Sequence, residues 1–391
     1  MPAMKEQAGA AAVTGTAIAA ALERAAAGER LEPGLAAAIH DAAPTADLLA
    51  AADARRRARV VPADRVTYLV DRNINYTNVC ITDCQFCAFY RPPGHPESYV
   101  NSRAVLGDKI AELVAVGGSR ILMQGGHHPD LRLGWYEDLL RWIGASFPTI
   151  EIDAFSPSEI QHIADVEGLP AATVLDRLIA AGLAGLPGGG AEILSDEVRG
   201  RISPKKQSAG GWIEMMRLAQ ERGLATTASM VIGFGESTQH RIEHLDRLRQ
   251  AQDQALSTHG NGFIAFIVWT AQFEHTSLGS SRFRPQFGAG PEAYLRQLAL
   301  ARLYLDNFAH FQASWPTMGP AVAAQALRAG ADDFGSTMLE ENVVSAAGTV
   351  RTRMDPAEIR AAIQDAGFVP AERDTRYRIR REFRAQAVAA S

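Results

Sequence analysis

The sequence predicts an α/β protein built around a (β/α)8 barrel, a ring of eight parallel strands surrounded by helices, with helical segments at both ends. Between residues 67 and 345, short β-branched and aromatic runs alternate with longer helical patterns, which indicates parallel strands joined by crossover helices. Eight such units fit the usual length of this barrel, and polar loops follow the strands, where that fold carries its active site. A partial barrel of six units with a separate C-terminal part is the alternative.

The N-terminal segment is expected to lie outside the barrel. An Ala-rich stretch over residues 1–18 is predicted to be a disordered extension. Residues 19–66 are predicted to form two or three short helices, because apolar residues recur at helical spacing and Pro33 and Pro44 separate the helices.

The barrel elements follow in chain order, and a helical tail is expected after them. The predicted strands are 67–76, 120–123, 150–155, 183–186, 226–232, 263–267, 311–314 and 333–335. The helical patterns between them include 136–145, 157–166, 171–181, 211–222, 238–254, 291–307 and 319–329. The barrel therefore spans 67–345, and residues 346–391 are predicted to form a C-terminal helical tail with one helix at 356–366.

Composition narrows the class of protein. The 391 residues carry a net charge of -5 and are 47% hydrophobic. The absence of a basic surplus argues against nucleic-acid binding, and no apolar run reaches the roughly 20 residues that cross a bilayer. We expect a cytoplasmic protein that binds a small molecule, with no nucleic acid and no membrane as partner.

All three cysteines of the chain, Cys80, Cys84 and Cys87, lie within eight positions. Three thiolates can hold three corners of a [4Fe-4S] cube and leave one iron open to a small molecule, whereas an electron-transfer cluster normally has four cysteines. A structural zinc site would need a fourth ligand such as His95. Disulfides are disfavoured by the odd count and the expected reducing compartment. The spacing therefore favours a cluster with an open iron.

Polar loops after the predicted strands are the second argument for an enzyme. They contain Gln124, Gly125, Gly126, His127 and His128 after the second strand, Ser156 after the third, Glu192 after the fourth and Gly233 after the fifth. Structural alternatives stay open: the glycine pair could be an ordinary turn, and Ser156 with Glu159 could form a capping box for the helix that begins at Pro157. At most one of the two adjacent histidines can face the barrel centre.

Several motifs resemble one known group of enzymes. The stretch 73–91 around the cysteines resembles the radical S-adenosylmethionine (SAM) enzymes that make menaquinone precursors and the deazaflavin cofactor. The stretches 124–131, 154–157, 186–192, 312–315 and 330–344 resemble the cyclase branch of that group, and the similarity covers about 48–377. Two positions depart from the pattern, Val268 and Phe273, where this group more often has proline.

The resemblance implies the cofactors and the residues that hold them. It implies a radical SAM barrel with a [4Fe-4S] cluster on Cys80, Cys84 and Cys87, and SAM as second cofactor. The residues carried over as SAM contacts are Phe86, Gln124, Gly125, Gly126, Ser156, Glu192, Ile232 and Gly233. For Phe86, a role as a plain core aromatic is the alternative.

The resemblance also implies a reaction. It implies that a 5'-deoxyadenosyl radical removes the ribosyl C4' hydrogen of dehypoxanthine futalosine, and that the carbon radical adds to the benzoate ring of the same molecule. An electron donor such as flavodoxin or ferredoxin would reduce the enzyme. Possible bases for the final proton are Asp153, Glu192, His127, His128 and Asp333, and possible partners of the benzoate are Arg91, His95 and Arg199.

Two other functions compete with the cyclase. A sister radical SAM enzyme, either an aminofutalosine synthase or the tyrosine-transferring component of deazaflavin synthase, would use the same radical on another substrate. A non-catalytic iron-sulfur sensor would use the cluster alone.

Overall fold

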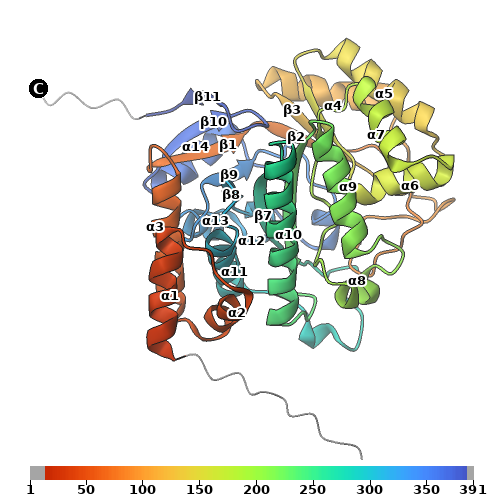
Figure 1. Cartoon of the computed structure of the whole chain (residues 1–391). Coiled ribbons are helices and arrows are strands. Elements are labelled where there is room, and N and C mark those ends of the chain that lie inside the picture. Colours follow the sequence, from red (N-terminus) through yellow and green to blue (C-terminus); the bar gives the residue numbers. More distant parts are fainter. Residues whose placement is uncertain (1–13, 385–391) are drawn as a thin grey trace, which may run out of the picture.

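The computed structural model describes residues 14–384 and shows a curled sheet surrounded by helices (Figure 1). The strands are β1 Arg65–Leu69, β2 Asp71–Asn75, β3 Arg120–Gln124, β4 Glu151–Ala154, β5 Gly185–Leu186, β6 Ala225–Ile232, β7 Phe263–Thr270, β8 His310–Gln312, β9 Asp333–Ser336, β10 Val369–Arg373 and β11 Ile379–Glu382. The helices are α1 Gly15–Ala27, α2 Pro33–Ala42, α3 Thr45–Arg59, α4 Arg103–Ala115, α5 Leu133–Ser146, α6 Pro157–Glu167, α7 Ala171–Ala180, α8 Asp196–Ile202, α9 Ala209–Glu221, α10 Thr238–Thr258, α11 Pro291–Tyr304, α12 Trp315–Met318, α13 Pro320–Ala326 and α14 Pro356–Asp365.

Eight parallel strands form the predicted barrel. From β2 to β9 each strand pairs in parallel with the next one along the chain, and β9 pairs in parallel with β1. Only Val70 separates β1 from β2, so the run of strands begins and ends on one extended segment. The amide of Asn73 also donates to the carbonyl of Met338 at 2.9 Å. The barrel prediction is confirmed, with the first predicted strand divided into β1 and β2.

The amino-acid pattern explains these elements. Strands β6 and β7 are buried at six of their eight positions each, as expected for parallel strands covered on both faces. The surrounding helices bury one face only; in α7 that face is Val174, Leu175 and Leu178. Glycine at position 168 ends α6 in a left-handed conformation, φ 65°, which glycine adopts without steric cost.

Helices α1, α2 and α3 form the predicted N-terminal segment and pack on α10 and α11 (Figure 1). Arg249 of α10 donates to the carbonyl of Leu31 at 2.7 Å, and Arg296 of α11 donates to the carbonyl of His40 at 2.6 Å. The predicted disordered extension, 1–18, falls largely outside the described residues. It is wrong for its last four residues, because α1 begins at Gly15, where the Thr14 hydroxyl accepts from the Ala17 amide.

The C-terminal tail corrects the prediction of a helical segment over 346–391. Helix α14 is present, but β10 and β11 follow it. β10 extends the sheet in parallel beside β1, and β11 pairs antiparallel with β10. The arginine-rich sequence hid these strands, because β10 ends in the buried Arg373 and β11 is mostly exposed. The turn between them, 374–378, lies at the end of the barrel where β6 and β8 begin, because Arg376 donates to the carbonyl of Gly223 at 2.8 Å and Tyr377 stacks on His310.

Within residues 14–384, none of the helices is both long and apolar enough to cross a lipid bilayer.

Candidate active site

The cysteines lie on the loop that follows β2, at the end of the barrel where the strands finish. The Cys80 amide donates to the carbonyl of Arg91 at 2.9 Å, and the Gln85 amide donates to the carbonyl of Ile202 at 2.8 Å. Cys84 is buried, with 8% of its surface exposed. These contacts tie the loop to itself and to α8, so that the thiols are held against the barrel.

The three thiols lie close enough together for their charges to change the pKa of Cys84. Burial raises the pKa of the Cys84 thiol to about 12, and the like charges of Cys87 and Cys80 contribute to that rise. Burial also raises the pKa of Cys87. Because like-charge effects of this kind require proximity, the three sulfurs lie in one small region.

The donor set fits an iron-sulfur cluster. Among residues 14–384, no three cysteine, histidine or acidic side chains are grouped so as to hold a single metal ion; in a cubane each thiolate instead binds a different iron. The Cys80 sulfur accepts from the Thr82 amide at 3.4 Å, and the backbone of Tyr90 and Phe89 partly offsets the rise that burial causes in the pKa of Cys87. Hydrogen bonds to sulfur tune such clusters. Three soft thiolates could therefore hold a [4Fe-4S] cluster and leave one iron free of protein.

Gly125 and Gly126 bring the loop after β3 against the cysteine loop. A Cβ atom on Gly126 would lie 2.1 Å from the carbonyl oxygen of Val79 and 2.8 Å from the Cβ of Cys80. A Cβ on Gly125 would lie 2.4 Å from the ring of Tyr76. The glycine pair is therefore more than an ordinary turn, because any side chain here would push the cysteine loop away.

Ser156 caps α6, as the structural alternative predicted: its hydroxyl accepts from the Glu159 amide at 3.3 Å. The Glu159 carboxylate does not complete a capping box. It accepts from the Gly125 amide at 2.9 Å, the Tyr76 hydroxyl at 2.8 Å and the Ser156 hydroxyl at 2.8 Å. Burial raises the pKa of Glu159 to about 7. This carboxylate fixes the glycine loop to α6.

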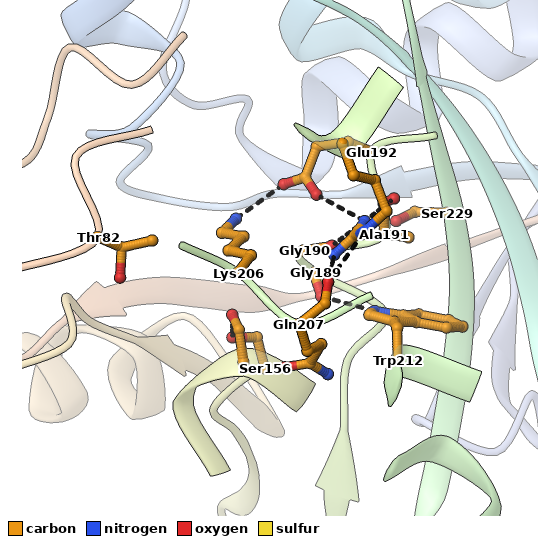
Figure 2. A network of polar contacts seen from close by, with 12 residues as sticks. Thr82, Ser156, Gly189, Gly190, Ala191, Glu192, Lys206, Gln207, Trp212 and Ser229 are labelled. Carbon is orange, nitrogen blue, oxygen red and sulfur yellow. Dashed lines mark hydrogen bonds and ion pairs between the residues drawn. The ribbon is translucent and has the colours of Figure 1, made fainter. Parts of the chain in front are cut away.

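Glu192 lies in a polar network beside the cysteine loop (Figure 2). Lys206 donates to its carboxylate at 2.9 Å, and Arg199 lies 3.4 Å from its other oxygen. Burial alone would lower the pKa of Lys206, but the charges of Cys84 and Glu192 raise it above the ordinary lysine value. Figure 2 shows Lys206 pointing toward Glu192, between the loop of Thr82 and the Gly189–Gly190 turn. This partly buried cation was not predicted, because nothing local in the sequence distinguishes Lys206 from its exposed neighbour Lys205.

The remaining expected SAM contacts surround the same place. Phe86 packs on Phe234 with ring centroids 5.1 Å apart, and the ammonium of Lys206 lies 5.5 Å from the centroid of the Phe86 ring. The side chain of Ile232 is fully buried, and Gly233 has φ 108°, a left-handed conformation that favours glycine. The Gly233 amide donates to the Glu236 carboxylate at 3.0 Å. Phe86 is therefore a packed aromatic of the cysteine loop.

A cavity of about 230 Å³ occupies the barrel interior. Of the residues predicted from the sequence, Gln124 and Asp153 line it. Asp153 accepts from Arg120 at 3.2 Å, and burial raises its pKa to about 6. Apolar residues form much of the remaining wall: Leu122, Ile264, Ile267, Trp269, Val343 and Val344.

His127 and His128 do not line this cavity, which is consistent with the expectation that at most one of them faces the barrel centre. His127 lines a separate groove beside the cysteine loop and stacks on His162 with centroids 5.0 Å apart. Burial lowers its pKa to about 3. His128 accepts from the Asp130 amide at 3.1 Å.

The three expected partners of the benzoate are also absent from the cavity lining. Arg91 donates to the carbonyls of Ala88 and Tyr90 and so holds the cysteine loop. His95 accepts from a backbone amide of the same loop at 3.1 Å. Arg199 donates to the carbonyls of Ala191 and Gln207. Their side chains are engaged by backbone groups of the loops, and their role toward a benzoate stays a prediction.

Asp333, another expected base, is fully buried and does not line the cavity. Its carboxylate accepts from the Thr67 hydroxyl at 2.6 Å, the Gly335 amide at 2.8 Å and the Arg373 guanidinium at 2.5 Å. Asp333 is therefore a structural anchor of β9 rather than a group facing substrate.

The cavity contains polar residues that the sequence analysis did not select: Asn73, Asn75, Arg120, Arg373, Thr375 and Tyr377. The alternation of Asn73 and Asn75 in one strand could have indicated a shared polar face. Arg120, in contrast, occupies the first position of β3, where an exposed arginine is commonplace.

Family models match two consecutive stretches of the chain. Residues 74–248 match the model of the radical SAM superfamily, and residues 260–386 match the model described as the CofH/MqnC C-terminal region. Among solved structures, methylornithine synthase shares the fold with a TM-score of 0.68 at 16% identity, covering 90% of this chain and 97% of that one. The FeFe-hydrogenase maturase HydG of Carboxydothermus hydrogenoformans gives 0.71 at 17% identity, covering 92% and 80%.

Curated relatives are similar over most of the chain. The cyclic dehypoxanthine futalosine synthase of Halalkalibacterium halodurans is 45% identical, covering 93% of this chain and 95% of its own length. That of Streptomyces coelicolor is 42% identical, covering 91% and 87%. The aminodeoxyfutalosine synthase of Thermus thermophilus is 37% identical, covering 80% and 83%.

A barrel of this kind, with three cysteines on the loop after its first strand, defines a radical SAM enzyme, and that class implies a [4Fe-4S] cluster and SAM. Within this class the chain belongs to the family of the cyclic dehypoxanthine futalosine synthases.

Proposed function

We propose that this protein converts dehypoxanthine futalosine into cyclic dehypoxanthine futalosine in the futalosine route to menaquinone. The observation that carries the proposal is the similarity of nearly the whole chain to two cyclic dehypoxanthine futalosine synthases, at 45% and 42% identity. The aminodeoxyfutalosine synthase and the 5-amino-6-(D-ribitylamino)uracil--L-tyrosine 4-hydroxyphenyl transferase are both 37% identical, over 80% and 81% of the chain.

Cys80, Cys84 and Cys87 are proposed as the cluster ligands, because they are the chain's three thiols and lie together on one loop, with Cys84 buried and the other two partly exposed. The proposed SAM contacts are Phe86, Gln124, Gly125, Gly126, Ser156, Glu192, Ile232 and Gly233. When bound and reduced, the cluster and SAM would supply a 5'-deoxyadenosyl radical. A flavodoxin or ferredoxin is the proposed electron donor.

The protein's own contribution is position. A primary alkyl radical abstracts almost any nearby hydrogen, so selectivity depends on which hydrogen the barrel presents. The cavity adjoins the glycine loop through Gln124, and Gly189 of its wall lies beside Gln124 and Ser156. Its apolar wall, with Trp269, offers an aromatic ring a dry surface and keeps water from a reactive intermediate.

The proposed reaction removes one hydrogen atom from the ribosyl C4' and joins that carbon to the substrate's benzoate ring. Restoring the aromatic ring would then release one proton to a base and one electron to an acceptor, such as the cluster left oxidised by SAM cleavage. One SAM is consumed for each turnover, and the substrate supplies both atoms of the new carbon-carbon bond.

The test is turnover by the anaerobically reconstituted enzyme with SAM and a reductant. We expect dehypoxanthine futalosine to give a cyclic product two hydrogens lighter than the substrate, with 5'-deoxyadenosine formed in equal amount, by mass spectrometry. Product formation only from an enolpyruvyl benzoate or from tyrosine would assign the chain to a sister activity. No 5'-deoxyadenosine under any condition would support an iron-sulfur sensor.

A further inference from the structure

At the end opposite the cysteines, the cavity has a polar wall, which we call the floor: Asn73, Arg120, Asp153, Thr375 and Tyr377. Arg120 is the first residue of β3, and Thr375 and Tyr377 belong to the turn between β10 and β11. The cysteine loop and the glycine loop follow the other ends of β2 and β3. The floor is therefore separate from the region that would hold the cluster and SAM.

Each floor residue has one buried polar atom without a hydrogen-bond partner. These atoms are Asn73 Oδ1, Arg120 Nε, Asp153 Oδ1, Thr375 Oγ1 and Tyr377 OH. Leaving such an atom unpaired costs about 1–3 kcal/mol, and native proteins keep few of them. Five around one cavity indicate that a polar ligand completes the hydrogen bonding.

The charges of the floor decide what kind of ligand fits. Arg120 donates to Asp153 and to Asp71, and Arg373 donates to Asp333. Two guanidinium groups thus meet three carboxylates, so the floor has no positive surplus to attract the substrate's carboxylate. The free atoms include a carboxylate acceptor, a guanidinium donor and two hydroxyls. Neutral hydroxyl groups, which both donate and accept, match this set.

We propose that the floor binds the hydroxyl groups of the substrate's sugar and so determines which sugar carbon faces the cysteine end of the barrel. This rests on the proposed function, which gives the substrate a ribosyl group and a benzoate. Asp153 then acts as a sugar-binding residue, because its free oxygen accepts from a hydroxyl. The benzoate ring lies against the apolar wall that contains Trp269.

The test measures discrimination against substrate analogues that lack one sugar hydroxyl. Thr375→Val and Tyr377→Phe each remove one hydroxyl and keep the side-chain shape. In the wild-type holoenzyme, we expect at least one of the 2'-deoxy and 3'-deoxy analogues to bind about tenfold more weakly than dehypoxanthine futalosine, as loss of one hydrogen bond predicts. In the variant that has lost the matching hydroxyl, this ratio should fall to near one.

Thr349→Val is the matched control, because Thr349 also has an unpartnered buried hydroxyl but does not line the cavity. It should leave the ratio unchanged. Thermal unfolding of the two floor variants should match or exceed the wild-type temperature, because each loses an unpaired group. An unchanged ratio in both floor variants would overturn the proposal. A second result would also overturn it: an analogue without the benzoate carboxylate binds more weakly than dehypoxanthine futalosine to the wild type but equally well to Arg120→Gln. Arg120 would then be the partner of the carboxylate.

The two proposals fail separately. Binding of the intact sugar with the expected discrimination but no cyclic product would remove the proposed function and keep the floor assignment. Normal cyclisation with no discrimination between the analogues would keep the proposed function and remove the floor assignment.

Discussion

The two ends of the barrel differ in how their polar groups are satisfied. At the cysteine end, the two carboxylates of the site are paired inside the protein: Glu159 accepts three hydrogen bonds, and Glu192 is paired with two cations, whereas the Gln207 amide and the Ser203 hydroxyl have no partner. At the floor, five residues keep an unpartnered buried atom. The first end is built in advance to hold a reactive cofactor in one place, whereas the second depends on its ligand for complete hydrogen bonding.

The difference also explains where substrate specificity arises. A rigid cysteine end suits chemistry shared by many radical enzymes, because the cofactor is held only while the groups that bind it keep their orientation. A floor with open hydrogen-bonding capacity rejects molecules that do not supply the missing groups. Relatives with different substrates should therefore differ more at the floor than at the cysteine end.

The largest expected effect is at the cysteine loop. Replacing Cys84 by Ala removes one of three proposed ligands, so iron binding and SAM cleavage should fall below detection. Because the loop lies outside the strands and helices, the far-ultraviolet circular dichroism spectrum should keep its wild-type shape. A spectrum of an unfolded chain would contradict this separation of cofactor site and barrel.

Gly126→Ala tests how tightly the cysteine end is built. The new Cβ would lie 2.1 Å from the Val79 carbonyl oxygen, so the backbone must move. We expect iron content per chain and SAM cleavage to fall by tenfold or more, a loss equivalent to about 1.4 kcal/mol or more. Gly134→Ala in α5 is the control, because nothing lies within 4 Å of its new methyl group. Equal activity of the two variants would mean that the loop is not closely packed.

The floor should show a pH dependence. The folded pKa of Asp153 is raised by burial from 3.8 to about 6, so folding favours its protonated form. The contribution of this protonation to the free energy of unfolding is fully present below about pH 4 and is lost as the pH rises through 6. At about 1.4 kcal/mol for each pKa unit, the loss is at most roughly 3 kcal/mol.

Asp153→Asn removes that titration. Between pH 4.5 and 7.5, the free energy of unfolding should fall more for the wild type than for the variant, as measured by chemical denaturation. Parallel curves for the two proteins would show that Asp153 titrates normally and that the floor is more hydrated than described.

The smallest expected effect is that of replacing Ser156, and it distinguishes a structural role of this residue from a contact with SAM. Ser156→Ala and Ser237→Ala each remove a helix N-cap, of α6 and α10 respectively, and each should cost about 1 kcal/mol of stability. If Ser156 also contacts SAM, only its variant should raise the KM for SAM. An identical KM in both variants would leave Ser156 with the capping role alone.

The sequence predicted the cysteine end better than the floor, for a physical reason. The three thiols are neighbours in the chain, so their spacing alone indicates a cluster. The floor instead combines Asn73 and Arg120 with Thr375 and Tyr377, which only the sheet topology brings together. Strand β10 was missed because Glu372 and Arg373 obscured its pattern, and with it the turn that supplies two of the five floor residues.

The predicted benzoate partners show a similar limit of sequence reasoning. A cationic or hydrogen-bonding side chain suits a benzoate, but backbone carbonyls and amides of the loops use the hydrogen-bonding groups of Arg91, His95 and Arg199. Charge and position in sequence do not reveal whether a side chain is committed to its own loop.

The proposed chemistry requires a [4Fe-4S] cluster on three thiolates with one iron open to SAM. The decisive experiment is electron paramagnetic resonance of the reduced, anaerobic protein with and without SAM. We predict about four irons per chain and a cluster signal whose g values change when SAM is added. Bound zinc in place of iron, or a cluster signal that SAM leaves unchanged, would contradict it.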